Sequence, residues 1–155
     1  NEKQQRVACW RACKEILNNF GVSGGDLIDG KALYQIAIES DNKLIVNKAI
    51  AKQSISYLDQ QLEKGNPVLV GVDHTYKYKG GFNNDVTTDH FVVIVGRGSK
   101  DKKVFYRFYE VGTSFKAKGI SNLNVLFVQD DYSLKGSTAY TSKHIYTVTQ
   151  IRKNL

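Results

Sequence analysis

Apolar residues recur at helical spacing before Gly65 and at strand spacing after it, and this switch limits the folds open to the chain. The first part predicts helices, because apolar residues three and four positions apart form one helix face. We expect helices at residues 9–20 and 54–64. Between them, Asp29 can cap another helix, in which Leu33, Ile36 and Ala37 recur at helical spacing. Gly21 and Gly65 follow two of these helices, as is usual just beyond a helix end.

The second part of the chain predicts strands. Short runs rich in β-branched and aromatic residues lie at residues 67–72, 91–95, 104–109, 123–128 and 145–151. A charged tetrad at residues 100–103 is typical of a polar hairpin tip. Helices in one half and strands in the other favour an α+β fold over alternating βαβ units. We therefore expect an α+β fold, with N-terminal helices packed on an antiparallel β-sheet.

Length and composition are those of one folded unit. A chain of 155 residues is long enough for one core and too short for two domains of ordinary size. We expect a single domain over residues 1–155, cut from a longer protein because the chain opens directly on the helix with the cysteines. No apolar run is long enough to span a bilayer, and residues 1–20 lack the apolar core of a signal peptide.

The chain is basic, with a net charge of +7. That charge favours an anionic partner such as nucleic acid, anionic lipid or a cell-wall polymer. The basic residues are dispersed, however, and match no nucleic-acid-binding motif. We expect neither a nucleic-acid partner nor a membrane span.

Two cysteines, Cys9 and Cys13, lie one turn apart on the first predicted helix. This spacing is too long for an unstrained disulfide. A thiol becomes a strong nucleophile as the thiolate, which a helix N-terminus favours, and we expect Cys9 in the first turn. Cys13 lies a turn deeper, where a cysteine usually behaves as a small hydrophobe. Cys9 is therefore the candidate nucleophile; the alternative is that both thiols are core residues.

His90 is the candidate general base among three histidines. It opens an apolar strand after a polar loop, where a rigid scaffold can hold a reactive group. His144 lies in the last predicted strand and is expected to be a surface or packing residue. His74 follows a strand and is expected to be a solvated loop residue, although it could line the site.

Glu110 is the candidate to orient the imidazole of His90. If residues 91–95 and 104–109 pair as a hairpin, His90 and Glu110 lie at the same end of the sheet. Asp89 points to the opposite face because strand neighbours alternate, and Asp85 is a weaker candidate from the loop. The alternative is that Glu110 is a solvated strand end.

An oxyanion donor would complete such a site. The backbone N–H of Cys9 is one natural donor. Gln4 and Gln5 lie just upstream and could supply a side-chain amide.

The order of these motifs resembles a known family. The motifs are a Gln-rich lead before Cys9-Trp10, Gly65-Asn66-Pro67 before a strand, Asp89-His90-Phe91-Val92-Val93, and Tyr109-Glu110-Val111-Gly112-Thr113. Over residues 4–113 the chain resembles the papain-like cysteine peptidase and amidase superfamily. It is similar in particular to bacterial double-glycine-leader-type (bacteriocin-processing-like) peptidase domains and to interbacterial amidase effectors.

The resemblance implies roles for five residues. Cys9 would be the nucleophile, His90 the base, and Glu110 would replace the usual Asp or Asn. Gln4 or Gln5 would be the oxyanion glutamine. The implied activity is hydrolysis of amide bonds in a protein or a peptidoglycan peptide, with no cofactor. Such a domain would be secreted or delivered to the periplasm within a larger toxin-like protein, and an immunity protein would be its partner.

Other classes of function remain open from the residues alone. A transferase would use the same chemistry with an amine or alcohol in place of water. A non-catalytic binding module would keep the scaffold without the reaction. A metal site built from Cys9, His74, His90 and Asp73 matches no common zinc spacing, so we expect no metal.

Overall fold

The computed structural model describes residues 2–23, 33–40, 43–74 and 88–154, with side chains from Ala8 onward in the first of these ranges. The helices are α1 (Glu2–Asn19), α2 (Lys48–Glu63) and α3 (Lys116–Gly119). The strands are β1 (Leu33–Gln35), β2 (Ala37–Ser40), β3 (Lys43–Val46), β4 (Val68–Asp73), β5 (His90–Lys100), β6 (Lys103–Tyr109), β7 (Val125–Val128), β8 (Leu134–Ser137) and β9 (Ile145–Arg152).

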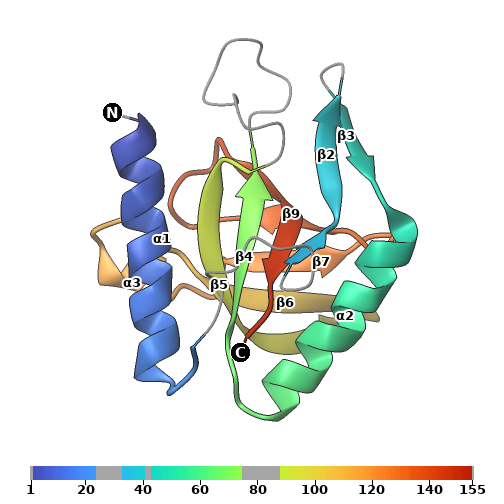
Figure 1. Ribbon diagram of the computed structural model, residues 1–155, viewed down its shortest axis with the longest axis horizontal. Helices are drawn as coiled ribbons and strands as arrows, with labels where there is room; N and C mark the ends of the chain where they lie inside the picture. Colours follow the sequence, from blue (N-terminus) through green and yellow to red (C-terminus); the bar gives the residue numbers. More distant parts are fainter. Residues whose placement is uncertain (1, 24–32, 41–42, 75–87, 155) are drawn as a thin grey trace.

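Six antiparallel strands close into a barrel in the order β9-β4-β5-β6-β7-β8. The barrel closes because β8 pairs with both β7 and β9. β1 is an extra strand on β9, beyond the stretch of β9 that pairs with β8. β2 and β3 form a separate hairpin (Figure 1).

The predicted arrangement of helices packed on a β-sheet is therefore wrong. The main cause of the wrong prediction is β8. Its sequence, Leu134-Lys135-Gly136-Ser137, contains one apolar residue and a glycine and so gives no strand pattern. Without β8 the remaining strands would leave two open edges. Because β8 pairs with both β7 and β9, the sheet closes into a barrel.

The predicted second helix is also wrong where it is described, because residues 33–40 form β1 and β2. Ile36 and Ala37 are buried as that pattern required, but as parts of extended chain. The backbone N–H of Ile36 donates to the carbonyl of Thr149 in β9 at 2.7 Å. Pairing with a strand more than a hundred residues away thus overrides the local helical spacing.

The other predicted elements are confirmed with shifted ends. Gly21 and Gly65 both follow helices with positive φ, at 73° and 79°, as expected beyond a helix end. The tip of the β5–β6 hairpin falls at Asp101 and Lys102, whose φ values of 52° and 65° suit a tight two-residue turn. β5 runs on to Lys100, well beyond the strand predicted at residues 91–95.

Two apolar clusters hold the helices to the barrel. The barrel interior is filled by side chains such as Val70, Ile94 and Phe108, and α2 adds Ala51 and Leu58 to it. The second cluster lies between α1 and the outer face of β4 and β5, and it contains Cys13, Leu17, Val22, Leu69 and Val93. Figure 1 shows α1 and α2 on different sides of the barrel. Within the described ranges, no helix is apolar over a length that could cross a bilayer.

Closure through β8 makes Gly136 a sensitive position. A Cβ at Gly136 would lie 1.8 Å from the carbonyl oxygen of Val125 in β7. We expect Gly136→Ala to lower the free energy of unfolding by about 1–3 kcal/mol or more, because the strands must separate to admit the methyl group. Urea denaturation measures this change.

Gly96→Ala in β5 is the matched control, since a Cβ there meets nothing within 4 Å. This variant should stay within about 1 kcal/mol of the wild type. Equal stabilities for the two variants would contradict the closed contact between β7 and β8.

Candidate active site

Cys9 lies on the face of α1 that packs against the barrel. It is half-buried, whereas Cys13 one turn later is fully buried in the cluster beneath α1. Burial, with smaller contributions from Cys9 and Glu110, raises the pKa of the Cys13 thiol well above its ordinary value. The expectation that Cys13 is a core residue is confirmed, and Cys9 is the accessible thiol of the pair.

We expected Cys9 in the first helical turn, but the structure places it further along α1. Helix α1 begins at Glu2, so Cys9 lies in its interior. Its backbone N–H therefore belongs to the hydrogen-bonded helix and is not one of the free donors at the helix start. The expected role of this N–H as an oxyanion donor is wrong for the same reason.

The structure brings Cys9, His90 and Glu110 into successive contact, with His90 between the other two. Sγ of Cys9 lies 2.9 Å from Nδ1 of His90. Nε2 of the same ring lies 2.6 Å from Oε1 of Glu110. The three side chains come from α1, the first residue of β5 and the position just after β6. The expected pairing of the β5 and β6 segments is confirmed, and it sets His90 and Glu110 at one end of the barrel.

The imidazole of His90 and the carboxylate of Glu110 form a buried ion pair. Burial opposes the charge on His90, but hydrogen bonds to Cys9 and Glu110 and the charge of Glu110 outweigh it and raise its pKa to about 9. Burial likewise opposes the charge on Glu110, but the hydrogen bond and charge of His90 and the N–H of Gly112 outweigh it and lower its pKa to about 2. At neutral pH a positive imidazolium therefore lies between Sγ of Cys9 and a carboxylate.

A glycine after Glu110 allows this close approach. The backbone N–H of Gly112 donates to Oε1 of Glu110 at 2.9 Å. A Cβ at Gly112 would lie 3.0 Å from that oxygen and 3.3 Å from Cε1 of His90. The motif around Glu110 thus supplies both a donor and the space for the imidazole.

Sequence reasoning missed two partners of Glu110, the hydroxyls of Thr138 and Tyr146. Each lies 2.8 Å from Oε2. Thr138 follows β8, which the sequence did not predict, and Tyr146 points into the barrel from β9. No local pattern marks either residue, because their meeting with Glu110 depends on barrel closure.

His74 and His144 are closer to the site than expected. Their rings stack with centroids 4.0 Å apart, and both also lie against Tyr146. Burial, and next the charge of His144, lower the pKa of His74 to about 4. Burial, and next the charge of His90, lower the pKa of His144. The expectation of a solvated His74 is wrong, and the stacked pair is neutral at pH 7.

Three candidate residues cannot be placed. The side chains of Gln4 and Gln5, the predicted oxyanion glutamines, lie outside the described residues. So does Asp85, the weaker alternative to Glu110.

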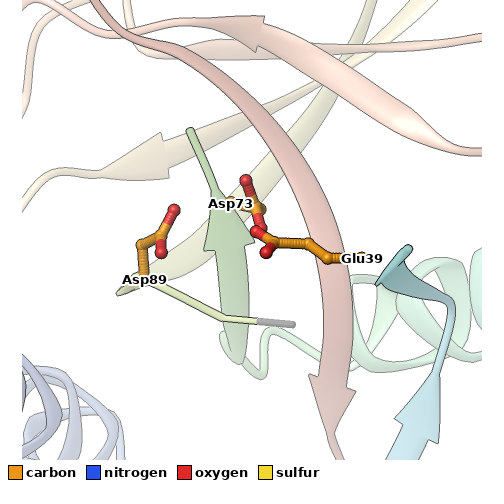
Figure 2. A group of neighbouring side chains, drawn as sticks. All are labelled: Glu39, Asp73 and Asp89. Atoms are coloured by element: carbon orange, nitrogen blue, oxygen red, sulfur yellow. The ribbon is translucent and has the colours of Figure 1, made fainter. Parts of the chain in front are cut away.

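The alternative metal site does not assemble. Asp73 does not join Cys9, His74 and His90 but lies with Glu39 and Asp89, and within the described ranges these three carboxylates approach within 4.8 Å of one another. They come from β4, β2 and the residue before β5 (Figure 2). One oxygen of Asp89 accepts the backbone N–H of His74 at 2.8 Å, which gives that carboxylate a structural role at the end of β4.

Comparisons with protein-family models, with curated proteins and with solved structures gave no match to this chain.

His90 should titrate above the ordinary pH range of a histidine, whereas His74 and His144 should titrate below it. His90 should keep its proton up to a pH of about 9, whereas His74 should stay neutral until the pH falls to about 4. NMR titration of the ring Hε1 signals, assigned with His-to-Gln variants, measures each midpoint. Because the folded-state pKa of His90 exceeds its ordinary value of about 6.5, its contribution to stability is complete below pH 6.5. That contribution should disappear as the pH rises through about 9.

Glu110→Gln is the control for this assignment, since it removes the charge that holds the proton on His90. In this variant the His90 midpoint should fall while the signal of His144 still titrates below its ordinary range. A His90 midpoint near 6.5 in the wild type would contradict the ion pair.

Proposed function

We propose that this chain is a cysteine hydrolase that cleaves amide bonds. Cys9 is the nucleophile, His90 transfers protons and Glu110 orients the imidazole. The observation that carries the proposal is the continuous contact from Sγ through the ring of His90 to the carboxylate, at 2.9 Å and 2.6 Å. Nucleophile, base and orienting group in this order are the arrangement that covalent acyl transfer requires.

The reaction follows from these contacts. The thiolate of Cys9 attacks the carbonyl carbon of the amide while His90 holds its proton on Nδ1. The C–N bond then breaks, His90 gives its proton to the departing amine, and a thioester remains on Cys9. Water attacks the thioester, His90 takes a proton from it, and the C–S bond breaks to release the acid and to restore the thiolate of Cys9 beside the protonated His90. No cofactor takes part in these steps.

The substrate class is a peptide, in a protein or in peptidoglycan. The net charge of +7 favours an anionic setting such as the cell wall. The order of Cys9, His90 and Glu110 resembles the papain-like peptidases and amidases, although the closed barrel is not the fold expected from that resemblance. We extend the proposal to a bacterial toxin-like context, with delivery outside the cytoplasm and an immunity protein as partner.

An activated thiol can be tested before any substrate is known. Iodoacetamide at about pH 5.5 should label Cys9 rapidly in the wild type, because the imidazolium of His90 favours the thiolate. His90→Ala should slow the labelling by at least about tenfold, since the charge beside Sγ is lost. Mass mapping over time measures the rate at each cysteine.

Cys13 is an internal control, because it is fully buried and should stay unlabelled in the folded protein. Glu15→Ala, at an exposed position two residues further along the same helix, controls for substitution alone. Slow labelling of Cys9 that His90→Ala leaves unchanged would exclude the hydrolase and favour a binding module.

Gln4 and Gln5 remain predicted oxyanion donors. Replacing the one that serves this role by Ala should lower turnover of a cleaved peptide by about 10²–10³. Iodoacetamide labelling of Cys9 should be unchanged, since alkylation develops no oxyanion. The other glutamine is the matched control, and a loss of labelling in either variant would instead indicate damage to the Cys9–His90 contact.

A further inference from the structure

The carboxylate of Glu110 is held at both oxygens. Oε1 accepts hydrogen bonds from Nε2 of His90 at 2.6 Å and from the N–H of Gly112 at 2.9 Å. Oε2 accepts hydrogen bonds from the hydroxyls of Thr138 and Tyr146, both at 2.8 Å. A carboxylate offers about four lone-pair sites, so this one is saturated. Its side chain is 0% exposed, so water cannot replace a donor that is lost.

Glutamate needs such a clamp more than aspartate does. Its side chain has one more rotatable bond than that of aspartate, and its terminal torsion is broad, so the carboxylate turns easily unless it is held. Here one oxygen must face His90 while the other is fixed from the opposite side. The donors to Oε2 therefore determine the orientation in which Oε1 faces His90.

Both hydroxyls are fixed independently of Glu110. The oxygen of Thr138 accepts the backbone N–H of Tyr140 at 3.1 Å. The ring of Tyr146 is 1% exposed and lies against Phe108 and His90, with ring centroids 5.9 Å and 5.8 Å away. Burial, and next the charge of Glu110, raise the pKa of Tyr146, so the phenol keeps its proton and acts as a donor.

We propose that Tyr146 and Thr138 are positioning residues for the reaction proposed above. Their hydroxyls hold Oε2 of Glu110 so that Oε1 stays on Nε2 of His90 and Nδ1 faces Sγ of Cys9. This inference rests on the proposed function for its catalytic meaning, but the clamp itself can be measured without any substrate.

Tyr146→Phe, Thr138→Val and the double variant remove the donors while nearly preserving side-chain shape. Two readouts apply to each folded variant. The first is the rate of iodoacetamide labelling of Cys9 at about pH 5.5. The second is the exchange rate of the Nε2–H proton of His90 with water, measured by NMR. We expect the double variant to label about tenfold more slowly and its Nε2–H proton to exchange about tenfold faster, as for the loss of a hydrogen bond to a charged group.

Tyr106→Phe is the matched control. Tyr106 is also a buried tyrosine of the barrel interior, and its hydroxyl donates to a carboxylate, that of Asp59, at 2.6 Å. The control therefore loses the same kind of bond away from the triad. It should lose less stability than Tyr146→Phe, because the side chain of Asp59 is 31% exposed and water can replace the lost donor. Both readouts should stay at wild-type values. Thr138→Ser keeps the hydroxyl and should keep both readouts as well.

The outcomes separate the two proposals. Wild-type rates of labelling and of exchange in both single variants would overturn the positioning role. The single variants are therefore a sufficient test if the double variant does not fold. Equal changes in Tyr106→Phe would also overturn it, since they would reflect general loosening. If wild-type Cys9 labels slowly and only the exchange readout responds to Tyr146→Phe, the clamp stands and the hydrolase proposal fails.

Discussion

The charge of Glu110 inside the barrel is the constraint on which the site depends. A buried carboxylate destabilises a fold unless donors surround it, and here the donors come from β5, the turn after β6, the end of β8 and β9. The β5–β6 hairpin is enough to bring His90 to Glu110, but Thr138 and Tyr146 are distant in sequence and become its neighbours only when the barrel closes. The ion pair with His90 then offsets much of the remaining cost, which is why the two groups shift each other's pKa in opposite directions.

The sequence predicted the elements better than their assembly. Apolar periodicity was sufficient for α1, α2 and the strongly β-branched β4 and β5. It failed at β8, where Lys135 and Gly136 break the alternation, and at residues 33–40, where pairing with β9 determines the structure. Both failures involve short strands whose stability comes from distant partners. Since β8 closes the sheet into a barrel, missing it changed the predicted fold class.

The core of the candidate site was easier to predict than its surroundings. Cys9, His90 and Glu110 could be identified because each stands at a recognisable place: on a helix, at a strand start and at a strand end. The hairpin of β5 and β6 then required His90 and Glu110 to meet. Tyr146 resembles any apolar strand residue in sequence, and Thr138 lies in a polar segment. His74 and His144 are separated by 70 residues, so their stacking needed the three-dimensional structure.

The nucleophile and its partners belong to different parts of the molecule. His90 and Glu110 are fixed to the barrel, whereas Cys9 depends on how α1 docks against β4 and β5. That docking uses the cluster of Cys13 and Leu17 with Leu69 and Val93, reinforced by an edge-to-face contact of Trp10 with Phe91 at 5.0 Å. Because residues four apart share a helix face, burying Cys13 places Cys9 at the rim of the same interface.

The rim position also explains what activates the thiol in the proposed mechanism. The influence of the helix dipole falls off within the first turn, and α1 begins well before Cys9. The stabilising charge must therefore come from His90, which lies against Sγ and is itself held in its charged form by Glu110. The thiol of Cys9 thus depends on the imidazolium of His90, and the imidazolium depends on the clamped carboxylate of Glu110. The clamp in turn depends on barrel closure.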